Sequence, residues 1–291
     1  MPAHQLLATA NSKKPLLLAW LNRSYRGSAQ FRNLLTDLGV FDDNISMKYC
    51  RRFVFMLVSL MVLASANAST NLPKNLTEAD QVRALEILGF GSSGKILADP
   101  YPLGGYSGVE FGLSTQFIPI GDLARLGSAT NSKGELSYYS LTMGKGLFYN
   151  VDVFAYFTPA IQSEEMQSFG GQLRWGFYEA NFFPISFSAM AYLGGANFQN
   201  LINVQTTGFD LIATVNMDKL ALYFGGGRIR AQGTFVGGAS GITASQETEK
   251  QDIVEDHSFF GVSIGFAKAF LALEVDRYSD SVYSGKLGFR F

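Results

Sequence analysis

The 291-residue chain has little of the chemistry that metal and redox sites use, with one cysteine and two histidines. Cys50 lies in a segment that we expect to be removed on export, which leaves the rest of the chain without a disulfide or a thiolate. The acids of the stretch 247–256 lack the spacing of a calcium-binding loop, and no phosphate-binding glycine motif is present. We therefore expect no cofactor and no metal.

Long apolar runs and an excess of positive charge are also missing. After residue 68 no apolar run is long enough to cross a membrane as a helix, so a membrane role must rest on strands. The formal net charge is −1, and residues 1–68 carry more bases than acids, which leaves an acidic remainder. This argues against a nucleic-acid partner, because nucleic acid requires a basic face.

A signal peptide is predicted over residues 47–68. Lys48, Arg51 and Arg52 form a cationic start, Phe53–Leu63 is an apolar run, and Ala66-Asn67-Ala68 supplies the small-x-small pattern of a cleavage site. A short buried helix is the alternative. Residues 1–46 are basic and acid-poor, as in an organellar transit peptide, but we expect a non-native or dispensable extension with the true start at Met47.

One short helix is predicted at Leu76–Leu88, within a periplasmic helix-and-linker region at 69–104. Thr77 can cap its start, and acids lie in its first turn. Two interpretations stay open: the helix packs at the periplasmic mouth of a barrel or on nothing at all, or it plugs the lumen.

From residue 105 to residue 291 the periodicity changes from helical to alternating, which predicts an all-β antiparallel up-and-down barrel. The runs are longer than strands of globular sheets and close to what a tilted membrane strand requires. Their connections alternate between long and short, as in barrels with tight turns at one end. The ten expected strands are Tyr106–Phe117, Glu135–Lys145, Val151–Thr158, Gln167–Tyr178, Pro184–Gly194, Asn203–Val215, Leu220–Gln232, Ser258–Lys268, Phe270–Tyr278 and Ser281–Phe291.

Aromatic residues are predicted to form two belts, one at each end of the strands. One belt comprises Phe148, Tyr149, Phe182, Phe183, Phe270 and Phe291, and the other comprises Phe117, Phe157, Phe169, Phe198, Phe235, Phe260 and Tyr278. The strand propensity of aromatic residues explains their number but not this placement.

The polar strand faces hold mostly small residues, with acids and bases in similar numbers. We therefore expect the apolar faces to meet lipid and the charges to pair inside a narrow lumen. The expected lumen charges are Glu110, Asp152, Arg174, Asp210, Arg228, Arg230, Glu274, Asp276, Lys286 and Arg290. A lipocalin-like soluble barrel, with its apolar faces inside, is the alternative.

The last eleven residues, SVYSGKLGFRF, place Tyr283, Leu287, Phe289 and Phe291 on one face and end on an aromatic residue. This pattern resembles the closing strand of bacterial outer-membrane β-barrels. The resemblance implies that these four residues form the assembly signal, that the chain is transmembrane and lies in the outer membrane of a Gram-negative bacterium, and that it meets outer-membrane lipids and lipopolysaccharide. Periplasmic chaperones and the barrel-assembly machinery are the implied protein partners.

A catalytic site is not expected. His257 is the one histidine after residue 68 and could act as a general base. His257 adjoins Ser258, so the two side chains point to opposite faces of a strand. In the lipid A deacylase family the histidine and the serine are two residues apart and point to the same face. Outer-membrane proteases of ten strands need further acids, and nothing in the sequence places Asp122, Glu164 or Glu165 for that role. We interpret His257 as an exposed loop residue.

Three classes of function follow. The favoured one is a structural or surface-interacting barrel that acts through the loops Ile118–Gly134 and Gly233–His257, with no enzymatic activity. A porin-like small-solute pore is the second, and an outer-membrane hydrolase is the third.

Overall fold

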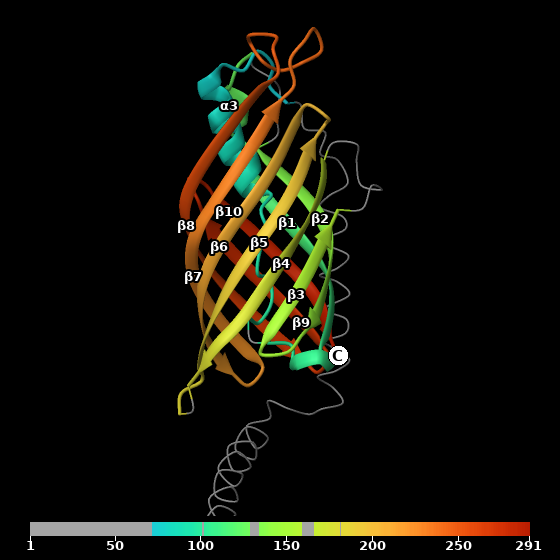
Figure 1. The fold of residues 1–291 in the computed structure, drawn as a ribbon, viewed down its shortest axis with the longest axis vertical. Helices are drawn as coiled ribbons and strands as arrows, with labels where there is room; N and C mark the ends of the chain where they lie inside the picture. Colours follow the sequence, from blue (N-terminus) through green and yellow to red (C-terminus); the bar gives the residue numbers. More distant parts are fainter. Residues whose placement is uncertain (1–71, 101, 129–133, 159–165, 181) are drawn as a thin grey trace, which may run out of the picture. The chain divides into compact units, whose positions relative to one another are not determined.

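The computed structural model describes residues 72–100, 102–128, 134–158, 166–180 and 182–291. The expected extension at 1–46 and the expected signal peptide at 47–68 lie outside the described residues, as do Glu164 and Glu165. The described chain begins with a short helical segment and continues as antiparallel strands that form a barrel (Figure 1).

The barrel has ten strands and is closed, which confirms the fold that the alternation predicts. Each strand pairs with its neighbours in the chain, and β1 pairs with β10, so no edge is left with unpaired backbone groups. The strands are β1 Val109–Pro119, β2 Glu135–Gly146, β3 Val151–Phe157, β4 Met166–Glu179, β5 Ile185–Phe198, β6 Ile202–Met217, β7 Leu220–Phe235, β8 Glu249–Phe266, β9 Ala269–Arg277 and β10 Ser281–Arg290.

The two ends of the barrel differ. At one end, here the turn end, lie the start of β1, the end of β10 and the connections 147–150, 180–184, 218–219 and 267–268. At the other end, the loop end, lie the connections 120–134, 158–165, 199–201, 236–248 and 278–280. Each of the first four loop-end connections is longer than the turn-end connection that follows it, as the sequence predicts.

The predicted loop Gly233–His257 is wrong in its bounds. β7 continues to Phe235 and β8 begins at Glu249, so the loop is 236–248 and His257 lies within β8. The acids at the start of β8 resemble a solvated loop in the sequence, but they keep strand periodicity because Asp252 and Asp256 pair with arginines of β7.

A belt of apolar side chains covers the outer surface. The exposed members that define this apolar belt are Phe111, Leu141, Met143, Val153, Phe157, Phe169, Leu173, Trp175, Phe177, Phe187, Leu193, Phe209, Leu211, Phe224, Phe260, Ile264, Phe266, Leu273, Tyr283 and Phe289. Soluble monomers rarely expose a continuous apolar surface of this kind, and a lipid-facing barrel requires one. The apolar faces therefore point outward, as predicted.

Short helical turns precede and interrupt the strands. α3 spans Glu78–Leu85 and continues as a π-helical turn, η1 at Glu86–Phe90, while η2 at Gly105–Ser107 and η3 at Leu123–Arg125 are single 3₁₀ turns. Thr77 caps α3 in a reciprocal capping box with Asp80, which confirms the predicted cap. Among the described residues, no helix has both the length and the hydrophobicity needed to cross a membrane.

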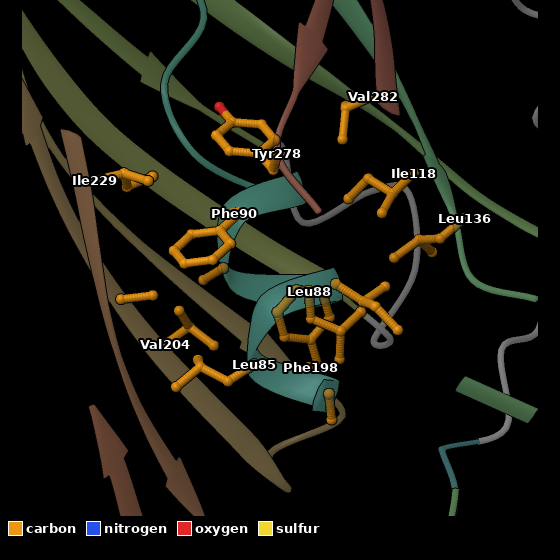
Figure 2. Packing of buried hydrophobic residues seen from close by; sticks show 14 of the residues in the cluster. Leu85, Leu88, Phe90, Ile118, Leu136, Phe198, Val204, Ile229, Tyr278 and Val282 are labelled. Carbon is orange, nitrogen blue, oxygen red and sulfur yellow. The ribbon is translucent and has the colours of Figure 1, made fainter. Parts of the chain in front are cut away.

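The helical segment α3–η1 packs inside the barrel at the loop end. Figure 1 shows α3 at the end of the barrel opposite the C-terminus. Leu85, Leu88 and Phe90 are buried against wall residues that include Phe198 and Ile229 (Figure 2). The helical segment therefore lies within the lumen, as the second of the two open interpretations has it.

Aromatic rings inside the barrel lie over glycines of the neighbouring strand. In each pair the two residues are directly opposite in register, and a Cβ added to the glycine would meet the ring at 2.1 to 2.3 Å. A larger residue would displace the ring, which explains why glycine lies there. The pairs are Phe154–Gly144, Tyr156–Gly170, Tyr192–Gly208, Tyr223–Gly261 and Phe270–Gly288.

Candidate functional site in the plugged lumen

Residues 76–99, here called the plug, run through the lumen from the loop end toward the turn end. The Leu76 amide donates to the Ile242 carbonyl at 2.7 Å in the loop 236–248. At the other end, Arg290 Nη2 of β10 donates to the Asp99 carbonyl at 2.8 Å. The chain therefore enters the barrel at the loop end and reaches β1 only after crossing the interior.

Arg83 on α3 fastens the plug at the loop end. Its guanidinium lies 2.8 Å from Glu86, 3.0 Å from Asp122 and 2.8 Å from Asp280. Partial burial lowers the pKa of Arg83, but the hydrogen bonds to Glu86 and Asp122 outweigh this and raise the pKa above its usual value. The side chain is therefore a permanent cation that joins the plug to two loops.

Glu274 of β9 holds the middle of the plug. Its carboxylate accepts hydrogen bonds from the Ile96 amide at 3.1 Å and the Leu97 amide at 2.8 Å. Tyr223 of β7 also donates its hydroxyl to Glu274, at 2.7 Å. An extended segment exposes such amides, and in a water-poor lumen they need acceptors from the wall.

The opposite wall satisfies the carbonyls of the same stretch. Gln172 Nε2 of β4 donates to the Lys95 carbonyl at 2.7 Å, and Arg174 Nη2 donates to the Ile96 carbonyl at 2.5 Å. The plug is thus bound through its backbone by β4 and β9, which lie on different parts of the wall.

The Lys95 side chain lies in a polar cluster that the sequence did not reveal. Its Nζ donates to the Tyr278 hydroxyl at 2.7 Å and to Ser93 Oγ at 2.9 Å, and it lies 3.8 Å from Asp276. Its isolation among glycine and aliphatic residues, in the stretch GSSGKILA, was the available signal. A single lysine in such a stretch needs a buried partner, and Asp276 supplies it.

His257 is part of this cluster, so its interpretation as an exposed loop residue is wrong. The side chain is 1% exposed, Nε2 lies 3.3 Å from Asp210, and the ring stacks on Tyr278 at 4.8 Å between centroids. The side chain is therefore buried within the barrel. Asp122, the described one of the three acids considered for a protease site, pairs with Arg83 at the loop end.

A second cluster bridges the seam where the barrel closes. Glu110 of β1 lies 2.6 Å from Lys286 and 2.7 Å from Arg290, both on β10. Arg290 also lies 3.7 Å from Asp99 of the plug. The ion pairs therefore tie the first strand to the last, and Arg290 ties the plug to the last strand.

The structure places most of the predicted lumen charges inside the barrel. Those residues are Glu110, Asp152, Arg174, Asp210, Glu274, Asp276, Lys286 and Arg290. Arg228 and Arg230 are exceptions, and their assignment to the lumen is wrong. They lie on the outer face of β7, where Arg228 is 70% exposed, while the intervening Ile229 is buried inside.

The reason is that β6, β7 and β8 extend beyond the apolar belt at the loop end. There the outer face carries polar residues and the inner face packs on the apolar α3–η1 segment, which is the reverse of the arrangement at belt level. The residues that define this polar wall are Asn203, Gln205, Thr207, Arg228, Arg230, Gln232, Asp252 and Asp256.

Two exposed ion pairs lie on the polar wall. Arg228 Nε lies 2.7 Å from Asp256, and Arg230 pairs with Asp252. Hydrogen bonds from Arg230 and Gln232 lower the pKa of Asp252 to about 2. This pair stays ionised at any pH a cell meets.

The predicted aromatic belts are correct for some residues and wrong for others. Phe157, Phe169, Phe260 and Phe291 are exposed on the outside. Phe198, Phe235, Phe270 and Tyr278 are buried inside, because the helical segment and the glycine pairs give their rings space within the barrel.

Little free space remains in the lumen. A cavity of about 20 Å³ beside Lys95 and Arg174 has room for about one water molecule. A larger space, about 340 Å³, opens at the turn end between Asp99, Lys219 and Lys268. Among the described residues, no cluster of three histidines, cysteines or acids is arranged to hold a metal ion.

The four residues of the expected assembly signal lie at the end of the wall. Tyr283, Leu287 and Phe289 share the outer face of β10. The Phe291 amide donates to the Val109 carbonyl at 2.9 Å, and the Val109 amide donates back at 3.0 Å. The terminal residue thus takes part in closing the barrel.

A closed up-and-down barrel with a lipid-facing belt and a polar, filled interior is the architecture of the small outer-membrane β-barrel proteins. No protein-family model and no curated protein sequence matches the chain.

Solved structures of this class are similar to the chain in fold. The N-terminal β-barrel domain of Pseudomonas aeruginosa OprF shares 12% identity over 64% of this chain and 99% of its own, with a TM-score of 0.32. The attachment invasion locus protein Ail of Yersinia pestis shares 14% over 63% and 97%, with a TM-score of 0.26. The KdgM porin shares 12% over 63% and 99%, with a TM-score of 0.32.

Proposed function

We propose that this chain is an integral protein of the bacterial outer membrane whose lumen is closed by its own N-terminal segment, and that it acts structurally or through the surface at its loop end. The observation that carries the proposal is the plug, which passes between both ends of the barrel and is bound by residues of several strands.

The orientation follows from the two ends. Barrels of this class place short turns and the C-terminus in the periplasm and longer loops outside. The polar wall and the loops 120–134 and 236–248 then form the external surface. The polar wall would stand above the headgroups, and the apolar belt would meet lipid and the acyl chains of lipopolysaccharide.

Assembly would use the end of β10. Tyr283, Leu287, Phe289 and Phe291 present apolar side chains outward at the strand that closes the barrel. This is the position at which the assembly machinery can bind the last strand before it pairs with β1. Periplasmic chaperones are the expected earlier partners, because the unfolded belt is apolar.

We also propose that the chain is not an enzyme. His257, the one histidine considered as a base, is buried and contacts Asp210 and Tyr278. Activity of an outer-membrane fraction that disappeared with His257→Ala would contradict this.

The test of the closed lumen is single-channel conductance. Purified, folded protein in a planar bilayer should give no regular current steps at voltages where a porin of similar strand number conducts. Regular steps from the unmodified chain would favour a small-solute pore instead. Membrane fractionation with an unboiled SDS gel tests the location, because a folded barrel of this class in the outer-membrane fraction resists SDS until it is heated.

A further inference from the structure

The ion pair between Lys95 of the plug and Asp276 of β9 is buried but poorly satisfied. The two side chains are 0% and 3% exposed, and Nζ lies 3.8 Å from Asp276 Oδ1, which is too far for a hydrogen bond. Nζ donates instead to the uncharged Tyr278 hydroxyl and Ser93 Oγ, and Asp276 Oδ2 has no hydrogen-bond partner among the described residues. A buried ion pair offsets the cost of its desolvation only with close contact and full hydrogen bonding.

A second buried pair in the same lumen has the contacts that this one lacks. Lys286 Nζ lies 2.6 Å from Glu110, and the same carboxylate lies 2.7 Å from Arg290. Two cations stabilise the ionised form of Glu110, which does not react with an amine. Among the described residues no second cation pairs with Asp276. Transfer of one proton from Lys95 to Asp276 removes both buried charges and leaves an amine beside a carboxylic acid.

We propose that Lys95 and Asp276 condense to an intramolecular isopeptide bond that joins the plug covalently to β9. The uncharged Nζ attacks Asp276 Cγ and forms the new C–N bond. One Nζ proton passes to a carboxyl oxygen, and the C–O bond to that oxygen breaks. The oxygen leaves as water with this proton and the acid proton. The products are an uncharged amide and one water, so the step needs no oxidant, reductant or further reactant.

The Tyr278 hydroxyl is placed to carry the proton. It accepts a hydrogen bond from Lys95 Nζ at 2.7 Å and donates one to Asp276 Oδ1 at 3.5 Å, so it can take up the Nζ proton as it passes its own to the carboxyl oxygen. The Tyr278 ring stacks on His257 and on Phe90, which fixes the position of its hydroxyl. Because the plug and β9 already hold the two reacting groups together, the condensation is an intramolecular step with a small entropic cost.

The bond has a consequence that hydrogen bonds do not have. It closes a covalent loop from Lys95 to Asp276 that includes β1 to β8, so the plug stays attached to the wall even when the barrel unfolds. A plug held by hydrogen bonds alone can also close the lumen. The proposed function and the isopeptide bond can therefore fail independently of each other.

Peptide mapping of the full chain, purified from membranes in its folded state and then denatured, tests the bond. Trypsin should not cleave after Lys95. The peptide Ala84–Arg125 should be joined to Ala269–Arg277, with a mass that is one water less than the sum of the two. Fragmentation of the joined peptide should place the link at Lys95 and Asp276. If the digest contains free Ala84–Lys95 and free Ala269–Arg277 and no joined peptide, the proposal is wrong.

Lys286 is the matched control within the same digest. It lies closer to its acid than Lys95 does, but trypsin should cleave after it, because Glu110 is held by two cations. A link at Lys286 in place of Lys95 would contradict the argument from the unsatisfied pair.

Two variants add a second measurement. Lys95→Arg and Asp276→Ala should each remove the joined peptide. On a boiled SDS gel the unmodified chain, which keeps its covalent loop, should migrate faster than either variant. A joined peptide that persists in Asp276→Ala would refute the assignment of the acceptor. The digest of the unmodified chain decides the question by itself, even if a variant fails to fold.

Discussion

At the residue scale, the pairing of aromatic rings with glycines decides what the interior tolerates. Tyr223 lies over Gly261 and donates its hydroxyl to Glu274, which holds the plug. One glycine therefore supports both the local packing and the contact between the wall and the plug.

Replacing this glycine should be costly. A Cβ at Gly261 would lie 2.1 Å from the Tyr223 ring, so Gly261→Ala should lower the free energy of unfolding by about 1–3 kcal/mol. Gly265 is the matched control, since it lies on the same face of β8 and its Cβ would meet nothing nearer than the Lys219 carbonyl at 3.6 Å. Gly265→Ala should change stability by less than about 0.5 kcal/mol. Urea unfolding followed by tryptophan fluorescence measures both, and equal losses would contradict the ring–glycine argument.

Glu274→Gln tests how the plug is held. The carboxylate accepts from two backbone amides of the plug, and an amide side chain would present a donor to one of them. Hydrogen bonds to charged groups contribute about 1.5–3 kcal/mol, so a loss of that size is expected in the same urea titration. Glu135→Gln, at an exposed position of β2, should leave stability unchanged. A Glu274→Gln variant as stable as the control would show that the plug does not depend on these bonds.

The sequence predicts the interior position of some of these residues but not the contacts of others. Balanced charge on small-residue faces was enough to place Glu110, Arg174 and Glu274 in the interior. The contacts of Lys95 and His257 could not be inferred, because they come from segments that only the folded plug brings together. Periodicity says which residues share a face, but it carries no information about the segment that this face will meet.

At the element scale, β7 shows why one face of a strand need not keep one environment. Tyr223 and Ile229 share the inner face, and Phe224 and Arg230 share the outer face. Phe224 belongs to the apolar belt, whereas Arg230 belongs to the polar wall above it. The alternation correctly predicts a strand, but the lumen assignment of Arg228 and Arg230 is wrong because the outer face of β7 is polar above the apolar belt.

Cysteine labelling tests this assignment, because the described residues include no cysteine. In intact cells, a charged maleimide should react with Arg230→Cys, which lies on the exposed wall, and not with Phe224→Cys, which lies in lipid, or Ile229→Cys, which packs inside. Labelling after boiling in SDS shows that all three thiols are present. Reaction at position 229 instead of 230 would support the lumen position that the sequence predicts for Arg228 and Arg230.

The strands themselves followed from the sequence to within a few residues, except where β8 begins. The helix also followed, with its cap at Thr77, because capping is a local property. Its position inside the barrel did not follow, since an amphipathic segment of this length fits a mouth as well as a lumen. The apolar inner face of β7 near Ile229 is the feature that indicates an apolar segment inside the barrel at this level.

At the scale of the whole molecule, the plug gives the chain an unusual path. The described chain starts at Leu72 beside the loop end, crosses the lumen, and only then enters β1 at the turn end. The segment before the plug and the C-terminus therefore lie at opposite ends of the barrel. Ser128 of the loop 120–134 donates its amide to the Lys74 carbonyl at 2.8 Å, which holds the start of this path at the loop end.

This path predicts opposite accessibility for two tags in the proposed orientation. A short epitope inserted immediately before Leu72 should bind antibody on intact cells, because the described chain starts at the loop end, where Lys74 is bonded to Ser128. The same epitope after Phe291 should bind only once the outer membrane is permeabilised, because the end of β10 pairs with the start of β1 on the periplasmic side. Flow cytometry with and without permeabilisation measures both, and a periplasmic marker protein controls for leakage. If the first tag were hidden in intact cells while an epitope in the loop 236–248 was accessible, the plug could not enter from the loop end. The N-terminal segment would then have to reach the lumen from the periplasm.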